Sequence, residues 1–94
     1  MHVTVVVPGA LRRFADGRSR MEVELPGDAT LGELLARLAD ECPALHRRIQ
    51  DETGALRRHV NVFVGETNVR DARLLDTGIP AGADVVVLPA VSGG

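Results

Sequence analysis

The residues with the clearest chemical potential are the final pair, Gly93-Gly94. Glycine has no Cβ, so a Gly-Gly end fits a narrow channel and leaves its terminal carbonyl open to attack. The last predicted strand ends at Pro89, and five uncharged residues follow it: Ala90, Val91, Ser92, Gly93 and Gly94. At about 3.3 Å per residue, this tail extends about 15–20 Å, which is enough to enter the active site of another protein. The alternative is a frayed chain end.

The other reactive side chains form no catalytic or metal-binding pattern. Cys42 is the single cysteine and falls on the apolar stripe of a predicted helix, so we interpret it as a buried structural thiol. One cysteine excludes an internal disulfide and a multi-thiolate zinc site, and it suits a reducing compartment such as the cytoplasm. The histidines His2, His46 and His59 are far apart and lack metal-ligand spacing, so we predict no metal site.

Length and composition limit the class of protein. The chain has 94 residues, which is enough for one domain. Its 11 basic residues, all arginine, stand against 13 acidic ones, and it contains no Trp or Tyr. Nucleic-acid-binding domains usually carry a basic excess, and single-strand binders use aromatic stacking platforms, so we predict no nucleic-acid partner. The apolar runs are too short for a membrane span, and we recognise no signal peptide.

Hydrophobic periodicity predicts the elements that must position the tail. Alternation with period two predicts strands over 2–7, 20–25, 59–64 and 84–88, with a short strand near 67–70. The period changes to 3.6 over 31–42, which predicts a helix, and one further helical turn is expected around Leu45 and Ile49. Segments 10–19 and 50–58 are predicted loops.

The start of the predicted helix has its own signals. Thr30 and Glu33 have the spacing of a capping box, in which each side chain bonds to the other residue's backbone. Glu33 and Arg37 are also spaced for an ion pair along one helix face.

The order of elements predicts an α+β fold, a mixed sheet of four or five strands covered on one face by one main helix. The first two strands are expected to pair antiparallel, and the first and last strands to be parallel central neighbours. We expect one domain over residues 1–89 and a flexible tail over residues 90–94.

Strand alternation also predicts a docking surface. One set of side chains should face the helix: Val3, Val5, Val7, Val60, Val62, Val64, Val85 and Val87. The opposite face then exposes Val6, Phe63, Val86 and Leu88, and such an apolar patch usually marks an interaction site. Scattered surface aliphatics are the alternative, and a one-residue error in register would exchange the patch with the core.

Four segments together carry a family resemblance: 2–8, 30–34, 60–64 and above all the ending 84–94, Asp-Val-Val-Val-Leu-Pro-Ala-Val-Ser-Gly-Gly. In combination they resemble the ubiquitin-like sulfur-carrier family, whose members serve molybdopterin, thiazole or cysteine biosynthesis. The resemblance covers nearly the whole chain. The Leu-Pro-Ala-Val-x-Gly-Gly ending and the arginine-rich lead into Val60-Asn61 are most similar to the actinobacterial branch that feeds cysteine synthesis.

The resemblance implies a ubiquitin-like β-grasp fold and a protein cosubstrate rather than an enzyme. An E1-like partner would use ATP to adenylate the Gly94 carboxylate, and a sulfur donor would displace AMP to leave a thiocarboxylate. A sulfur-acceptor enzyme, of cysteine-synthase type or another, would then take the sulfur, and a metalloprotease is a further implied partner that releases the product. The carrier itself would bind no cofactor, which agrees with the missing catalytic constellation.

Several functions are compatible with this resemblance. The carrier could instead serve molybdopterin, thiamin or a sulfur-containing natural product. A ubiquitin-like modifier that joins Gly94 to lysines of other proteins needs the same adenylate. A noncatalytic β-grasp binding subunit would not use its tail at all.

Overall fold

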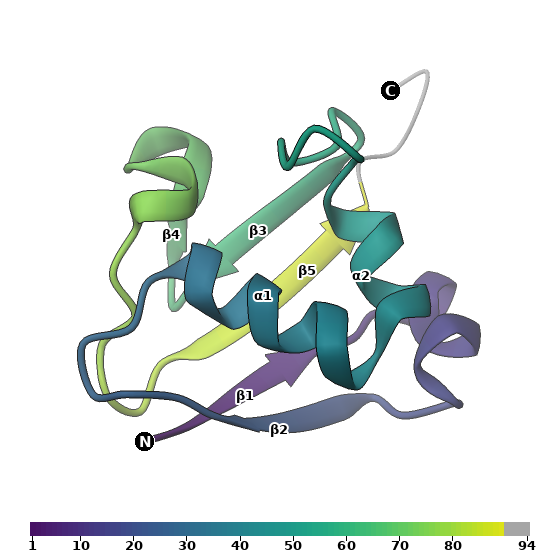
Figure 1. The fold of residues 1–94 in the computed structure, drawn as a ribbon, viewed down its shortest axis with the longest axis horizontal. Coiled ribbons are helices and arrows are strands. Elements are labelled where there is room, and N and C mark those ends of the chain that lie inside the picture. The colour runs from purple at the N-terminus through teal and green to yellow at the C-terminus, as the bar shows by residue number, and fades with distance from the viewer. Residues whose placement is uncertain (90–94) are drawn as a thin grey trace.

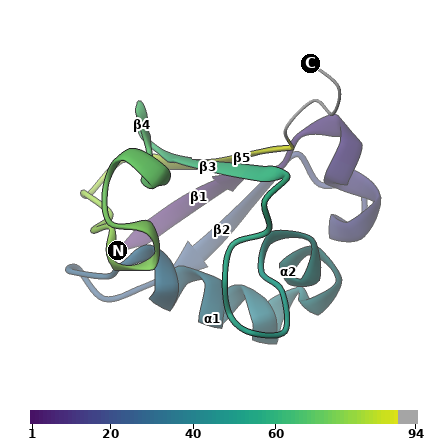
Figure 2. The ribbon, with the colours of Figure 1, turned by 90° about the horizontal axis from the view of Figure 1, so that it is seen from above.

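The computed structural model describes residues 1–89. The tail, Ala90 to Gly94, lies outside the described residues, so the expected domain boundary after residue 89 and the expectations for the tail stay predictions. Within residues 1–89 the chain forms a five-stranded mixed sheet with its two α-helices on one face (Figures 1 and 2). This arrangement confirms the predicted α+β fold class.

The strand order is β2-β1-β5-β3-β4, so the first and last strands are central neighbours. β1 (His2–Val6) runs antiparallel to β2 (Arg20–Glu24) and parallel to β5 (Asp84–Pro89). β3 (Val60–Val64) pairs antiparallel with β5 and with the short β4 (Thr67–Asn68). The pairings of β1 with β2 and with β5 match the predicted ones.

The main helix, α1 (Leu31–Glu41), begins where its capping signal predicted. The Glu33 backbone N–H donates to Thr30 Oγ1 at 3.3 Å, and the Thr30 backbone N–H donates to Glu33 Oε1 at 3.3 Å. α1 ends at Cys42, whose backbone is not helical, and α2 (Pro43–Ile49) starts directly after it. The predicted additional turn is therefore a separate second helix, because Pro43 suits a first helical turn and not a helix interior.

The core confirms the predicted strand register. All eight valines assigned to the helix-facing side are buried: Val3, Val5, Val7, Val60, Val62, Val64, Val85 and Val87. They pack against the leucine stripe of α1 and against Leu45 and Ile49 of α2. Because strand side chains alternate, this register also determines which residues lie on the open face.

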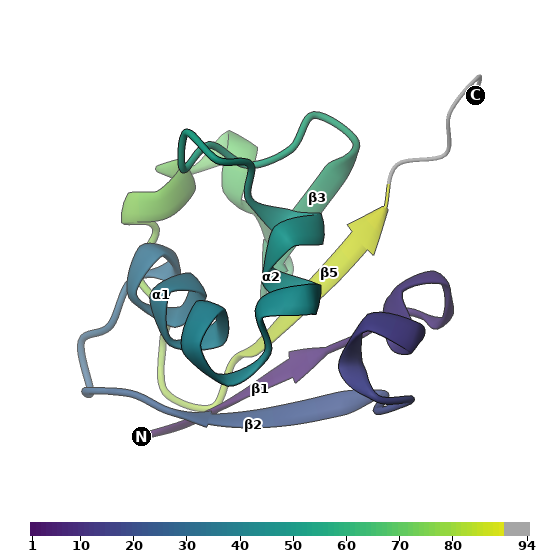
Figure 3. The same ribbon diagram turned by 45° about the vertical axis from the view of Figure 1, so that its right-hand side comes forward.

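Two expectations for the segments between the main elements are corrected. The predicted loop 10–19 contains a 3-10 helix, η1 (Gly9–Ala15), which buries Leu11 and lies at the end of the sheet where β1 and β5 finish (Figure 3). The short strand after β3 stops at Asn68, whose side chain accepts a hydrogen bond from the Arg70 backbone N–H at 3.0 Å. This cap starts the 3-10 helix η2 (Val69–Asp71), and a further 3-10 helix, η3 (Leu74–Asp76), follows it.

The predicted ion pair between Glu33 and Arg37 does not form. Glu33 is engaged in the capping box, whereas Arg37 Nε lies 3.5 Å from Glu41 Oε2, one turn further along α1. Glu33 and Glu41 are each four residues from Arg37, so spacing alone does not select the partner of Arg37. The cap engages Glu33 and leaves Glu41 to pair with Arg37.

Candidate functional site

The structure brings the four predicted patch residues together on the open face of the sheet, opposite the helices (Figure 2). Val86 of β5 is paired with Val6 on one side and Phe63 on the other, so these three side chains form a row across β1, β5 and β3. Leu88 lies two residues further along β5 on the same face. We call Val6, Phe63, Val86 and Leu88 the sheet patch.

The sheet patch is accessible but not fully exposed. Val6, Phe63 and Val86 are half-buried, and Leu88 is 42% exposed. Polar side chains border it: Thr4 donates a hydrogen bond to Glu22 at 2.8 Å, and Asn68 donates to Asn61 at 3.4 Å. An apolar row with a polar border is typical of an interaction surface.

One residue of the sheet patch, Leu88, lies close to the start of the tail in the chain. Leu88 precedes Pro89, the last described residue, which is paired with Val60, the first residue of β3. A protein that covers the sheet patch therefore also covers the point where the chain continues into residues 90–94. The tail residues Ala90, Val91, Ser92, Gly93 and Gly94 lie outside the described part.

Cys42 is a structural thiol, as predicted. It is 6% exposed, and its Sγ donates a hydrogen bond to the Phe14 carbonyl at 3.2 Å. The Phe14 ring itself lies beneath two guanidinium groups, those of Arg13 and Arg48, with 4.9 and 4.2 Å from the guanidinium carbon to the ring centre. Cys42 thus joins η1 to the junction between α1 and α2.

The three histidines lie in separate surroundings. His2 Nδ1 is 3.2 Å from Glu24 Oε1, His46 contacts Gln50 and His59 is exposed. Within residues 1–89, no three His, Cys, Asp or Glu side chains are grouped so that they could hold a metal ion. None of the helices in this range is long and apolar enough to cross a membrane.

Asp51 organises the loop between α2 and β3. Its carboxylate accepts hydrogen bonds from the Thr53 hydroxyl at 2.6 Å and from the backbone N–H groups of Thr53 and Ala55 at 2.8 and 3.1 Å. The Thr53 hydroxyl bond is the largest cause that lowers the pKa of Asp51 below its ordinary 3.8. Hydrogen bonds to the charged form favour that form.

This lowered pKa predicts an acid-dependent contribution of Asp51 to stability. A group whose pKa is lower in the folded state stabilises the fold above its unfolded pKa, and the contribution is lost as the pH falls through the folded pKa. We expect Asp51→Asn to be less stable than the parent at neutral pH and the difference to shrink in acid. Urea unfolding of both proteins across this pH range measures it, and a constant difference would contradict the assignment.

One further concave surface was not anticipated. An open hollow of about 550 Å³ lies between α1 and the end of β2, and it is lined in part by Glu24, Leu25 and Pro26. The sequence did contain a signal for it. Glu33, Ala36, Arg37 and Asp40 recur at helical spacing on the wet side of α1, and all four line the hollow.

The ubiquitin-like β-grasp class is defined by a mixed sheet with a helix across one face. This chain has that arrangement, with an apolar patch on the other face and a Gly-Gly end in its sequence. Comparison with known families agrees: the model described as ThiS family matches residues 5–94. The chain belongs to the ThiS family of ubiquitin-like sulfur carriers.

Individual relatives are similar over their full length. Sulfur carrier protein CysO of Mycobacterium tuberculosis is 38% identical over 96 residues, which covers 100% of both chains. Among solved structures, the crystal structure of SAMP1 from Haloferax volcanii has a TM-score of 0.82 and 30% identity over 100% of both chains. The crystal structure of the Amycolatopsis orientalis BexX/CysO complex has a TM-score of 0.81 and 33% identity, covering 98% of this chain and 99% of the matched chain.

Proposed function

We propose that this chain is a sulfur carrier for cysteine biosynthesis, which acts as a protein cosubstrate through a thiocarboxylate on Gly94. The observation that carries the proposal is the full-length similarity to the mycobacterial protein named sulfur carrier protein CysO. The ThiS family match also extends to residue 94 and so includes the Gly-Gly end.

The proposed chemistry needs no catalytic group from the carrier. A carboxylate is a poor electrophile until one of its oxygens becomes part of a good leaving group. An E1-like partner therefore joins the Gly94 carboxylate to AMP from ATP and releases pyrophosphate. A sulfur donor then attacks the acyl carbon, AMP leaves, and the tail ends in a thiocarboxylate. The carrier binds no cofactor, since ATP belongs to the activating partner.

Delivery of the sulfur returns the carrier to its starting state. The thiocarboxylate sulfur attacks an electrophilic carbon of a substrate held by a cysteine-synthase-like acceptor enzyme, and the leaving group of that carbon departs. The carrier is then joined to the substrate through a thioester, which is an acyl–sulfur bond. Water then cleaves the acyl bond, so the product keeps the sulfur and Gly94 regains its carboxylate. We assign this hydrolysis to a metalloprotease. The proposal puts the cycle in the cytoplasm, where the unpaired Cys42 thiol stays reduced.

We propose the sheet patch as the surface that docks these partners. The CysO of the matched Amycolatopsis orientalis structure is described there in a complex with BexX, which supports binding to a partner protein. Full burial of a large apolar side chain contributes about 1.5–3 kcal/mol, whereas association costs about 4–15 kcal/mol. Because three patch residues are already half-buried, their gain is smaller. The balance favours reversible binding, which a carrier that moves between enzymes requires.

Intact-protein mass spectrometry tests the proposed chemistry. The carrier is incubated with ATP, a sulfide source and candidate E1-like enzymes from the same host. We expect the mass increase of one oxygen replaced by sulfur, mapped to the C-terminal peptide and absent without ATP. No increase with several enzymes that are active on other carriers would contradict the proposal.

A second assay separates the carrier from a ubiquitin-like modifier. Host lysate is probed by immunoblot for high-mass adducts of this chain that resist hydroxylamine, which cleaves thioesters. We expect the free carrier to dominate. Abundant resistant adducts would favour the modifier, and transfer of labelled sulfur to a molybdopterin or thiazole precursor in place of cysteine would contradict the proposed pathway.

A further inference from the structure

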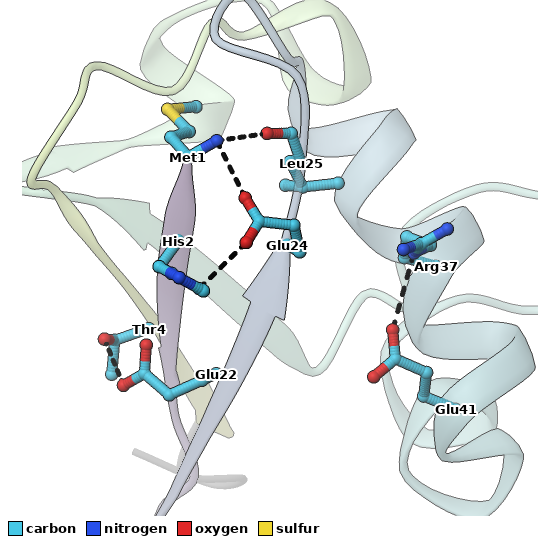
Figure 4. A network of polar contacts seen from close by, with 8 residues as sticks. All are labelled: Met1, His2, Thr4, Glu22, Glu24, Leu25, Arg37 and Glu41. Atoms are coloured by element: carbon cyan, nitrogen blue, oxygen red, sulfur yellow. Dashed lines mark hydrogen bonds and ion pairs between the residues drawn. The ribbon is translucent and has the colours of Figure 1, made fainter.

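A second surface lies on the edge of the sheet furthest from β4, where β2 runs beside α1. The 550 Å³ hollow there is lined by three apolar residues, Leu25, Pro26 and Ala36, and by charged residues of both elements. A second hollow of about 470 Å³ shares Glu24, Arg37 and Asp40 with it. Because the two hollows share these residues and both adjoin β2, we treat them together as one surface, the β2–α1 groove. In Figure 4, Glu24 lies on β2 with its carboxylate toward Met1 and His2, and Arg37 lies on α1.

The backbone of β2 is available along this groove. Within residues 1–89, β2 is an edge strand paired only with β1. Leu25 and Met1 exchange two hydrogen bonds, and the Val7 backbone N–H donates to Ser19. In an antiparallel pair the groups that point to the partner alternate along the strand, so Met21 and Val23 also face β1. The N–H and C=O groups of the intervening Arg20, Glu22 and Glu24 therefore point away from the sheet.

The groove carries an excess of negative charge. Five carboxylates line its two hollows: Glu22, Glu24, Glu33, Asp40 and Glu41. Arg37 Nε lies 3.5 Å from Glu41, and Glu24 is contacted by the Met1 amine at 3.0 Å and by His2 Nδ1 at 3.2 Å. Glu24 stays 57% exposed and Glu41 44% exposed. An exposed edge with outward backbone groups is a template for another strand, and acidic rims select basic partners.

We propose that the β2–α1 groove binds an extended basic segment of a partner protein, which adds as a further strand to the free edge of β2. The segment's backbone pairs with Arg20, Glu22 and Glu24. Its alternate side chains lie over Leu25, Pro26 and Ala36, and its Lys or Arg side chains meet the surrounding carboxylates. This mode takes affinity from main-chain hydrogen bonds and specificity from alternate side chains.

The β2–α1 groove lies away from Pro89, where the described chain ends. A partner bound in the groove therefore adds to the proposed sulfur transfer and does not replace it. β1 and β5 run parallel with Thr4 opposite Asp84, and β5 then runs on to Pro89 in the direction away from His2. The groove is centred on Glu24, which is opposite His2. A segment bound there leaves the sheet patch free, and binding does not depend on the chemistry of Gly94.

A peptide titration followed by amide NMR tests the proposal directly. The probe is a short, capped peptide of alternating arginine and valine, and its matched control replaces each arginine by glutamate. We expect the basic peptide to shift and protect the outward amides of Glu22 and Glu24 and to shift Ala36 and Asp40. We expect the acidic peptide to cause no shifts. Added salt weakens binding severalfold because the rim charges are exposed.

Two variants of one residue separate strand addition from charge. Glu22→Ala and Glu22→Pro both remove the carboxylate, but only proline removes the outward N–H and obstructs a new strand. Proline is tolerated at edge positions whose N–H faces solvent, so the fold should persist, and circular dichroism checks this. We expect binding to be about tenfold weaker in Glu22→Pro than in Glu22→Ala, from the loss of main-chain hydrogen bonds.

A charge variant keeps the test independent of the proline. We expect Glu24→Gln combined with Asp40→Asn to weaken binding at least about fivefold. The matched control, Glu66→Gln with Asp71→Asn, removes two exposed carboxylates elsewhere and should bind like the parent. Equal binding of the acidic peptide, shifts confined to the sheet patch, or equal binding by the two Glu22 variants would overturn the proposal. Concentration-dependent shifts of the β2 amides without peptide would do so too, since they indicate a second copy of this chain in the groove.

Discussion

Addition of one alanine after Gly94 is expected to reduce thiocarboxylate formation by at least about 100-fold, because displacement of a reacting group by an ångström costs about that much. The added residue moves the terminal carboxylate about 3.3–3.6 Å along the chain. The added alanine also places a Cβ beside the new terminal carboxylate, where the parent has glycine without a side chain. The activating enzyme would then hold an amide where it needs a carboxylate.

The matched control for this experiment is Ser92→Ala, which makes a change of similar size but keeps the length and the Gly-Gly end. We expect it to form the thiocarboxylate at nearly the parent rate in the same mass assay. If the extended chain gains sulfur as fast as the parent, the Gly94 carboxylate is not the reacting group, and a binding subunit that does not use its tail becomes the better account.

Leu88→Asp is expected to weaken binding of the activating enzyme by about 10- to 100-fold, because loss of an apolar interface anchor costs about 1–3 kcal/mol and tenfold is about 1.4 kcal/mol. The reason is desolvation: the new carboxylate would lose water when the sheet patch is covered and would gain no partner in an apolar row. Titration calorimetry with the enzyme and without ATP measures the effect on binding apart from the chemistry.

The chain offers a close control for this substitution. Leu74 on η3 is 45% exposed, against 42% for Leu88, and η3 is not part of the sheet whose open face carries the patch. Leu74→Asp therefore makes the same chemical change at similar exposure outside the sheet patch, and we expect it to leave binding unchanged. Phe63→Asp, on β3 at one end of the row, should act like Leu88→Asp. Equal effects of the Leu74 and Leu88 variants would mean that the enzyme docks elsewhere.

Much of the fold was predictable because local and tertiary signals agree. The helix-facing valines of β1, β3 and β5 repeat with period two, and only one register buries them all. The same register determined in advance that Val6, Phe63 and Val86 share the opposite face. The start of α1 was predictable for a local reason, since a capping box is complete within four residues.

Local sequence signals failed to predict the structure where contacts with distant residues, or a competing partner for one side chain, determine it. The segment 10–19 has no strong periodicity, and η1 forms because Leu11 and Ala15 reach the core. Two carboxylates, those of Glu33 and Glu41, are spaced to pair with Arg37. Glu33 is engaged in the cap of α1, so Arg37 pairs with Glu41. Cys42 looked like the last residue of a helix, but Pro43 after it starts a new one.

The amino-acid sequence by itself determined the class of fold, the core face of each strand, the start of α1 and the Gly-Gly end, because periodicity, caps and composition act over a few neighbouring residues. Only the tertiary structure decided that Val6, Val86 and Phe63 form one continuous row, since the row depends on the order in which distant strands pair. The tertiary structure alone also determined the β2–α1 groove, because its two sides come from a strand with period two and a helix with period 3.6. Surfaces that join distant segments depend on strand order and helix placement, which the whole core determines at once.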